Sequence, residues 1–347
     1  MSETDLFPPV TPPDADVHRA AFDHQLTLTK PAGSLGRLEE IGAWLSACQG
    51  CCPPNRITDP SVVVFAGDHG VAAHGVSAFP AEVSLQMAHN IGEVGGAGVN
   101  VLARAAGARV QVADISLDHD VTGPDRVRRG CGAINIEDAM TQEETLRAIE
   151  VGKRLADREV DSGADLLIAG DLGIGNTTPS AVLIGLATGT EPVVVVGRGS
   201  GIDDEGWKRK TAVVRDAMFR ARDLRHDPVA VLRAVSSPDM TAMAAFLAQA
   251  AVRRTPVLLD GVVVTAAALW ADRLAPGSAA WWMAGHRSVE PAHSIALAHL
   301  GKQPIVELGM RLGEGSGAAA ALPLVRVAVD IMRDMTTFES AGVSGVH

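Results

Sequence analysis

The sequence predicts an α/β fold: a doubly wound, mostly parallel, Rossmann-like sheet with a smaller helical domain. Three observations support this fold class. Short β-branched runs alternate with helix-periodic segments, the runs are continuously apolar, and each ends in Gly or Asp. Continuous apolar runs indicate strands that are covered on both faces. The expected strands lie at 61–66, 109–115, 165–169, 192–196, 257–259, 280–284 and 304–308.

Helical segments at the two ends of the chain predict the smaller domain. Residues 17–50 carry apolar side chains at spacings of three and four, and Pro31 and Gly33 interrupt them, so two helices are expected there. A polar, irregular stretch at 116–140 is expected to form a long excursion before a helix at 141–160. The expected division is a flexible lead-in (1–16), the helical part of the small domain (17–55), the α/β catalytic domain (56–315) and C-terminal helices that complete the small domain (316–347).

The composition excludes several classes of protein. Hydrophobic residues make up 47% of the 347 residues, which permits a sizeable core and excludes global disorder. Aromatic residues are only 3% and the net charge is −11, so no nucleic-acid partner is expected. Any anion must therefore be bound by local groups such as helix N-termini and loop amides.

Cysteine usage and hydropathy set further expectations. Three of the four Cys crowd residues 48–52, which is no disulfide framework, and no second Cys or His pair completes a zinc site. No apolar run approaches the length of a membrane span, and the acidic, Pro-rich start is unlike a signal peptide. We therefore expect a cytoplasmic protein with no bound metal and no membrane partner.

Five loops that follow expected strands are candidates for the ligand site, because ligands of open parallel sheets bind beyond the carboxyl ends of the strands. Each loop has a structural alternative, such as a tight turn or a helix cap. Glu314, between two glycines at a helix start, could pair with the helix dipole or act as a general base. The loops are 65–71 with Asp68 and His69, 170–179, 196–204, 284–293 and 308–317.

Six motifs in order make the sequence more specific than any loop alone. The motifs are Lys30-Pro31-x-Gly33-Ser34-Leu35-Gly36-Arg37-Leu38-Glu39, Gly67-Asp68-His69-Gly70-Val71, Gly173-Ile174-Gly175-Asn176-Thr177-Thr178, Gly197-Arg198-Gly199-Ser200-Gly201-Ile202-Asp203-Asp204, Gly285-His286-Arg287-Ser288-x-Glu290-Pro291 and Leu312-Gly313-Glu314-Gly315-Ser316-Gly317-Ala318-Ala319. With these six motifs, over roughly residues 17–340, the chain closely resembles the nicotinate-nucleotide–dimethylbenzimidazole phosphoribosyltransferases.

The resemblance implies an enzyme that moves phosphoribose from nicotinate mononucleotide to 5,6-dimethylbenzimidazole and releases nicotinate. The product, α-ribazole 5′-phosphate, supplies the lower nucleotide loop of cobalamin. The resemblance also implies a parallel-sheet α/β domain with a smaller helical part, a homodimer, and no metal or other cofactor.

Site residues are carried over by motif. Glu314 resembles the general base, and Asp171 and Lys210 match positions of a supporting carboxylate and lysine. The family has Glu where Asp171 stands, and Asp is one methylene shorter, which reduces its reach. The expected substrate-binding residues are Gly173, Gly175, Asn176, Thr177, Arg198, Gly199 and Ser288 on the nucleotide side, Ser77, Gln86 and Met87 on the benzimidazole side, and Leu312 and Gly313 beside the base.

Two alternatives remain at this stage. A phosphoribosyltransferase that uses phosphoribosyl pyrophosphate is disfavoured, because such enzymes carry paired acids directly after an apolar strand, whereas Asp203 and Asp204 are displaced from Val196. A non-enzymatic sensor of a base or nucleotide would not need Glu314. The sequence does not specify the preferred acceptor base, the kinetic order or a role for the cysteines.

Overall fold

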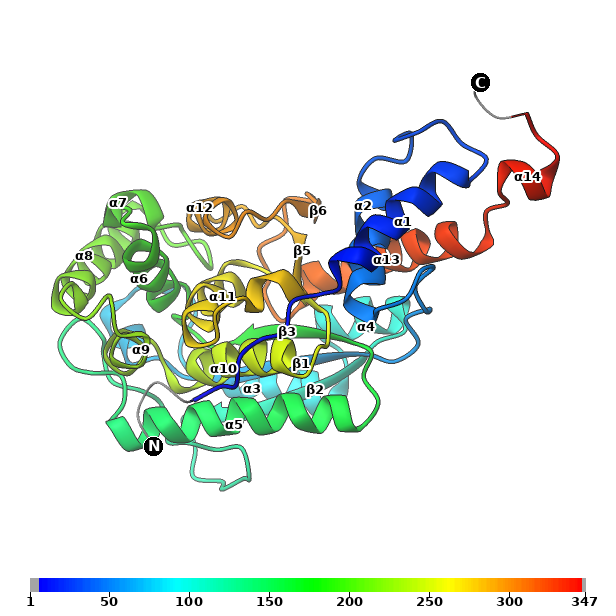
Figure 1. Cartoon of the computed structure of the whole chain (residues 1–347). Helices are drawn as coiled ribbons and strands as arrows, with labels where there is room; N and C mark the ends of the chain where they lie inside the picture. Colours follow the sequence, from blue (N-terminus) through cyan, green and yellow to red (C-terminus); the bar gives the residue numbers. More distant parts are fainter. Residues whose placement is uncertain (1–5, 345–347) are drawn as a thin grey trace.

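The structure is a computed structural model that describes residues 6–344 (Figure 1). Within these residues six strands form one sheet, in the order β2-β1-β3-β4-β5-β6, and every neighbouring pair is parallel. The predicted α/β fold is confirmed, with an entirely parallel sheet. The strands are β1 (Pro60–Gly67), β2 (Arg109–Ser116), β3 (Leu166–Leu172), β4 (Val257–Leu259), β5 (Trp282–His286) and β6 (Pro304–Val306).

One expected strand is wrong. Residues 192–196 were expected to be a strand because of their four consecutive valines, but they form the single helical turn α7 (Pro192–Val195). Pro192 occupies the first helical position, where its missing N–H costs nothing and its fixed φ suits a helix start. Val193 and Val194 are about half exposed (51% and 49%). Their preference for strand is therefore not reinforced by burial in the sheet, and the helical turn forms instead.

The longer helices cover both faces of the sheet or extend beyond it. The predicted helix at 141–160 is α5, and the two helices expected within 17–50 are α1 and α2. The helices are α1 (Ala15–Thr27), α2 (Arg37–Gln49), α3 (Val83–His89), α4 (Gly98–Ala106), α5 (Gln142–Asp161), α6 (Thr177–Thr188), α8 (Asp204–Ala221), α9 (Pro228–Val235), α10 (Pro238–Val252), α11 (Val262–Leu274), α12 (Pro291–His299), α13 (Ser316–Asp334) and α14 (Phe338–Ala341), with short turns η2 (Gly70–His74), η3 (Asn90–Val94) and η4 (Ser278–Trp281). No helix within residues 6–344 is long and apolar enough to cross a membrane.

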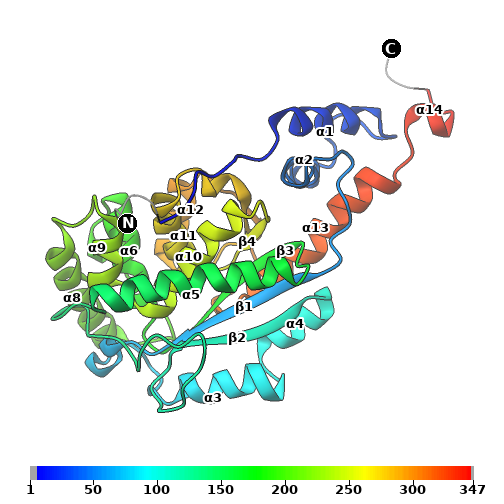
Figure 2. The same cartoon turned by 60° about the horizontal axis from the view of Figure 1, so that its bottom comes forward.

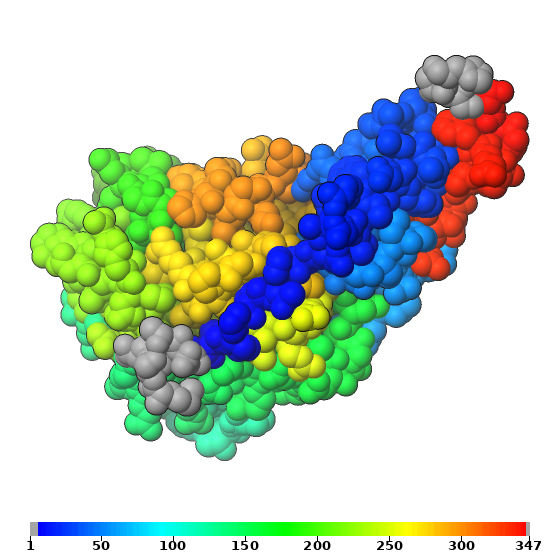
Figure 3. Space-filling model, viewed as in Figure 1, coloured from blue at the N-terminus to red at the C-terminus, as the bar shows by residue number. Residues whose placement is uncertain are grey.

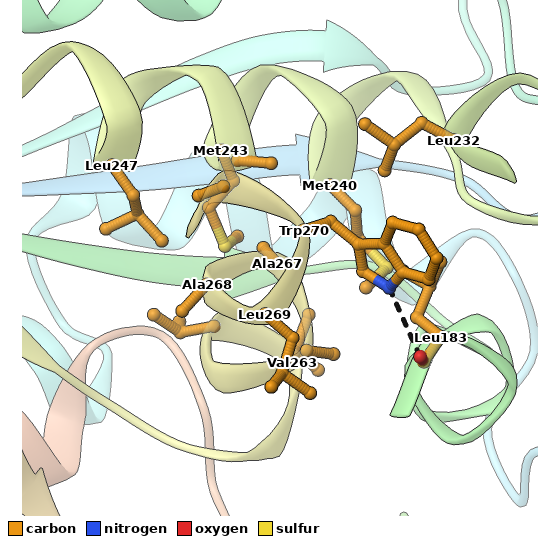
Figure 4. Close-up of a cluster of buried hydrophobic side chains, with 14 of the residues drawn as sticks. Leu183, Leu232, Met240, Met243, Leu247, Val263, Ala267, Ala268, Leu269 and Trp270 are labelled. Carbon is orange, nitrogen blue, oxygen red and sulfur yellow. Dashed lines mark hydrogen bonds between the residues drawn. The ribbon is translucent and has the colours of Figure 1, made fainter. Parts of the chain in front are cut away.

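Two apolar layers explain the continuous valine run of β1. Val63 and Phe65 face a core formed with α5, α6, α10 and α11, whereas Val62 and Val64 face a second core formed with α2, α4 and α13. Alternate residues of a strand point to opposite faces, so a strand covered on both sides must be apolar throughout. In the first core, the Trp270 indole on α11 packs among side chains of neighbouring helices and donates a hydrogen bond to the Leu183 carbonyl at 3.1 Å (Figure 4).

The helices from the two ends of the chain lie together beyond one end of the sheet (Figure 2). We call α1, α2, the C-terminal half of α13, and α14 the helical arm. The amide of Thr29 donates to the carbonyl of Thr336 at 3.0 Å, which joins the two ends of the chain there. The N-terminal half of α13 packs on the sheet through Leu322, so this helix connects the arm to the body.

The described part of the expected lead-in runs across the surface of the body toward the helical arm (Figure 3). The Trp281 indole donates to the carbonyl of Thr11 at 2.9 Å, and Asp14 caps the start of α1. The first five residues of the expected lead-in lie outside the described residues.

Candidate active site

A pocket of about 710 Å³ lies beyond the carboxyl ends of the strands. The strand order changes direction between β1 and β3, so adjacent connections leave the sheet on opposite faces there and open a crevice. Four of the five candidate loops contribute to its wall. The lining residues are Phe79, Val83, Met87, Asp171, Leu172, Gly173, Ile174, Asn176, Thr177, Gly199, Ser200, Gly261, Val262, Val263, His286, Ser288, Glu290, Met310, Arg311, Leu312, Gly313 and Glu314.

Glu314 enters the pocket from an unusual turn. Gly313, Glu314 and Gly315 all have positive φ (83°, 65° and 88°), and the left-handed region is unfavourable for a residue with a side chain. The Glu314 amide donates to the carbonyl of Asp171 at 3.1 Å, and its Oε2 accepts from the amide of Val99 at the start of α4 at 3.3 Å. Burial raises the pKa of the Glu314 carboxyl, and the charge of Asp260 adds to that rise.

Asp171 lies near the end of β3, beside the same turn. Its Oδ2 accepts from the Asn176 side-chain amide at 2.7 Å. Burial raises the pKa of Asp171 well above its ordinary value, and the nearby carboxylates of Asp260, Glu314 and Asp239 raise it further. Two close carboxyls do not both ionise readily. The rise in pKa is the larger for Asp171, so Glu314 is the better candidate of the two for a carboxylate that acts as a base.

A second part of the pocket suits an anion. Thr177 is the first residue of α6, where free backbone N–H groups and the helix dipole favour negative charge. The fully buried Lys210 reaches this point from α8 and donates to Thr177 Oγ1 at 2.6 Å. Burial lowers the pKa of Lys210 to about 8, opposed by the charge of Glu290. Lys210 is therefore mostly protonated at neutral pH.

Hydrogen bonds from several segments hold the 196–204 loop beside Thr177 and Lys210. The amide of Gly199 donates to Glu290 Oε1 at 2.9 Å, and its carbonyl accepts from Arg311 Nη1 at 2.9 Å. The Ser77 and Ser200 hydroxyls are 3.1 Å apart, which ties the loop to the segment before α3. The side chain of Arg198 turns elsewhere, to Asp204 at 2.5 Å and to the carbonyl of Ile202 at 3.0 Å.

The remaining wall is apolar. Phe79, Val83 and Met87 contribute from and before α3, Val262 and Val263 from α11, and Met310 and Leu312 from the loop that ends at Glu314. Such a surface suits a flat, uncharged ring. Leu312 lies close to Gly98 at the start of α4, where a Cβ would come within 2.6 Å of its Cδ2.

The structure brings most of the residues expected at the site together. Five of them do not line the pocket: Ser77 and Lys210 contact residues that do, Gly175 lies in the turn behind it, Arg198 points away, and Gln86 is exposed on α3. The expected residues that line it are Met87, Asp171, Gly173, Asn176, Thr177, Gly199, Ser288, Leu312, Gly313 and Glu314.

The Asp68 and His69 loop lies behind the pocket. His69 Nε2 is 3.7 Å from Asp239 Oδ2, and both side chains are buried. A Cβ at Gly173 would lie 2.8 Å from His69 Nε2, so this ring supports the 170–179 loop from below and requires glycine there. In residues 6–344 no group of three or more His, Cys, Asp or Glu side chains could hold a metal ion.

Arg311 and Asp260 were not singled out from the sequence. Arg311 lies in the 308–317 loop, in which only Glu314 was considered as a functional residue. Nothing in the sequence near Arg311 indicates that its side chain reaches Gly199. Asp260 directly follows the buried run Val257–Leu259, as Asp171 follows its own apolar run, and that shared signal could have identified it.

Comparisons of the chain with known proteins indicate its family. Residues 10–343 match a family model described as phosphoribosyltransferase. The chain is 68% identical to the nicotinate-nucleotide–dimethylbenzimidazole phosphoribosyltransferase of Corynebacterium efficiens, over 99% of this chain and 93% of that protein. It is 59% identical to the protein of the same name from Mycobacterium avium, over 97% of this chain and 98% of that protein.

A solved structure also matches in fold. The crystal structure of nicotinate-nucleotide–dimethylbenzimidazole phosphoribosyltransferase from Thermus thermophilus superposes with a TM-score of 0.90 at 40% identity, over 95% of this chain and 99% of that chain. A structure of CobT from the same organism gives a TM-score of 0.89 at 41% identity, with the same coverage. The resemblance inferred from six motifs is thereby confirmed, and the chain belongs to the nicotinate-nucleotide–dimethylbenzimidazole phosphoribosyltransferase family.

Proposed function

We propose that this protein transfers the phosphoribosyl group of nicotinate mononucleotide to 5,6-dimethylbenzimidazole, releasing nicotinate and forming α-ribazole 5′-phosphate for cobalamin assembly. The observation that carries this proposal is the position of Glu314. Its buried carboxylate lies in one pocket with an apolar wall and with the group of Thr177, Lys210 and Gly199, which suits an anion. These are the three features that an uncharged aromatic acceptor and a phosphorylated donor require.

The proposed transfer reaction needs one general base and no general acid. The acceptor ring nitrogen attacks C1 of the ribose, while the bond from C1 to the pyridinium nitrogen breaks and its electron pair returns to that nitrogen. Nicotinate leaves with a neutral ring, so no proton need be supplied to it. The acceptor must lose its N–H proton, which Glu314 Oε1 or Oε2 receives. Attack opposite the leaving group converts the β-nucleotide to the α-product.

Two sets of contacts hold the reactants in this scheme. The donor phosphate binds at the start of α6, where Thr177, Lys210 and Gly199 supply a hydroxyl, an ammonium and a loop backbone. The benzimidazole lies against the apolar wall that includes Met87 and Leu312. Fixing both reactants in one enclosure removes much of the entropic cost of the bimolecular step.

The test is product analysis by mass spectrometry and NMR after the protein is mixed with the two substrates in the presence of EDTA. Nicotinate and α-ribazole 5′-phosphate in equal amounts would support the reaction, the donor and independence from divalent metal together. Turnover that requires Mg²⁺ and phosphoribosyl pyrophosphate would contradict it. Binding of both ligands without any product would instead indicate a sensor.

We also propose that the protein is a homodimer whose small domain, expected at 17–55 and 316–347, is built from these two segments, with the N-terminal half of α13 connecting it to the body. The family resemblance supports the dimer, and the helical arm with the middle of α13 offers exposed apolar side chains for an interface: Phe22 and Leu26 on α1 and Leu324 and Val327 on α13. Light scattering on the purified protein tests the assembly. A monomer at micromolar concentration would contradict it.

A further inference from the structure

Asp260 is a fully buried carboxylate that no step of the proposed reaction uses. It lies directly after β4, and its two oxygens accept from two amides at the start of α13: Oδ2 from Gly315 at 3.2 Å and Oδ1 from Ala318 at 2.9 Å. Gly315 is the N-cap of α13 and has no side chain that could accept these bonds. A carboxylate from a neighbouring strand therefore caps the helix that begins next to Glu314.

The turn that carries Glu314 needs to be held. Glu314 has a φ of 65° and lies between two glycines that can adopt many conformations. Such a backbone persists only where the surroundings determine it. On the N-terminal side, its own amide is bonded to the carbonyl of Asp171. On the C-terminal side, the bond from the Gly315 amide to Asp260 restrains the turn.

The turn also rests directly on β3. A Cβ at Gly170 would lie 2.3 Å from both the carbonyl carbon and the carbonyl oxygen of Glu314, so the two backbones touch where glycine allows it. This contact fixes how far the Glu314 backbone lies from β3, but it does not fix the direction that the chain takes after Glu314. The hydrogen bonds from the first turn of α13 to Asp260 set that direction.

The other side of Asp260 is closed by His286 at the end of β5. His286 Nε2 is 3.5 Å from Asp260 Oδ1, and both side chains are buried. A Cβ at Gly317 would lie 2.1 Å from Cδ2 of the His286 ring, so the ring is packed tightly against the first turn of α13. Asp260 is thus confined between His286 and the helix, with little freedom to follow α13 if the helix shifts.

We propose that Asp260 is a positioning residue for the transfer reaction: by bonding the amides of Gly315 and Ala318, it holds the Glu314 carboxylate where the acceptor N–H meets it. The proposal rests on the proposed function, because it takes Glu314 as the base. It differs from an ordinary helix cap in predicting that the catalytic effect of Asp260 depends on Glu314.

The experiment is a double-mutant cycle with Asp260→Asn, Glu314→Gln and the double variant, measured by single-turnover release of nicotinate with enzyme in excess. Asp260→Asn keeps the shape and one oxygen acceptor but gives up the second. It is expected to lower the transfer rate between about 10-fold and 100-fold, the range for a small misplacement of a reacting group. KM for nicotinate mononucleotide should stay within about twofold, because the phosphate contacts lie elsewhere. In the Glu314→Gln background the same change should cost less than about twofold, since groups that act as a unit are not additive.

Asp165→Asn is the matched control. Asp165 also accepts backbone amides, from Thr58 at 2.6 Å and Asp59 at 3.1 Å, but it lies at the opposite end of the strands from the pocket. It should alter the melting temperature without changing the transfer rate. Thermal melting and donor binding establish that each variant is folded, and Asp260→Ser, which keeps an oxygen acceptor, replaces Asp260→Asn if the latter does not fold.

The outcomes separate the two proposals. An equal loss from Asp260→Asn in both backgrounds, or an unchanged rate in the Glu314-containing enzyme, would overturn the positioning role of Asp260 and leave the proposed function intact. Absence of product from the folded wild-type protein would overturn the proposed function, and the positioning role with it. A loss confined to the Glu314-containing background supports both.

Discussion

The most direct test of the site is Glu314→Gln. Glutamine has nearly the shape of glutamate, and its side-chain oxygen can still accept from the amide of Val99, as Glu314 Oε2 does at 3.3 Å. The main-chain bond to Asp171 is not affected by the change, so the left-handed turn should be kept. The substitution therefore removes the capacity to take up a proton and little else.

The expected loss follows from that role. A positioned general base contributes about 10²-fold to 10⁴-fold to a rate, so kcat should fall by a factor in that range. In the proposed function the donor phosphate binds at Thr177 and Lys210, which the change does not touch, so KM for nicotinate mononucleotide should be nearly constant. Loss of kcat without loss of donor affinity is the signature of an interaction made in the transition state.

The assay is the initial rate of nicotinate release between pH 5 and 9, with donor affinity measured separately by calorimetry. Burial raises the pKa of Glu314, so the wild-type rate should decline on the acid side at a higher pH than an ordinary glutamate would give. The remaining activity of Glu314→Gln should lack that decline. Glu339→Gln on α14, an exposed glutamate in the helical arm, is the matched control and should behave as wild type.

Two results would refute the reasoning. Turnover of Glu314→Gln within about threefold of wild type would show that no base of this strength acts at this position, given the range above. A large rise in donor KM with unchanged kcat would show that Glu314 binds substrate and does not take the proton.

Four further predictions test the neighbouring contacts. Asp171→Glu, which introduces the residue expected from the family resemblance, should keep most of the wild-type kcat in initial-rate assays; complete loss would show that the shorter acid is required. Lys210→Met should raise KM for nicotinate mononucleotide about 10-fold or more, because it removes a charged partner of the phosphate. The wild-type KM should likewise rise above pH 8 or so, where the Lys210 ammonium, with its pKa lowered to about 8, loses its proton; a flat KM profile up to pH 10 would contradict this. Gly170→Ala should reduce kcat about 10²-fold, because its Cβ would lie 2.3 Å from the Glu314 backbone and must displace the base; wild-type kcat in a folded variant would show that the backbone relaxes harmlessly.

The strands could be predicted from the sequence where burial and local preference agree. β1 combines β-branched residues with burial on both faces, so its apolar run correctly predicted a strand that is covered on both sides. The run at 192–196 is also rich in valine, but Val193 and Val194 are half exposed and a proline begins the run, so the local preference for strand is not supported by any sheet position. Composition alone does not distinguish these two runs, because the difference lies in tertiary packing.

The site could be predicted at the level of loops but not of every side chain. Parallel strands bring their carboxyl ends to one edge, so loops more than a hundred residues apart in sequence, such as those of Thr177 and Glu314, were expected to meet. The order of strands and loops in the sequence does not predict the direction in which a loop side chain points. Arg198 was expected at the donor site but pairs with Asp204, whereas Arg311 holds the loop to which Arg198 belongs. Only the folded chain shows which of the two arginines faces the pocket.

The charge distribution of the pocket fits the charge change in the proposed reaction. The donor carries a phosphate anion and a pyridinium cation, and the cation is neutralised as nicotinate leaves. An ionised carboxylate close to the pyridinium would stabilise the reactant more than the transition state and slow the step. Burial, and after it the nearby carboxylates, raise the pKa of Asp171 well above its ordinary value, which favours the uncharged carboxyl and so lowers this penalty. Burial and the carboxylates of Asp260, Glu314 and Asp239 thus disfavour a negative charge on Asp171, while the proposed reaction needs one carboxylate, Glu314, to take the acceptor proton.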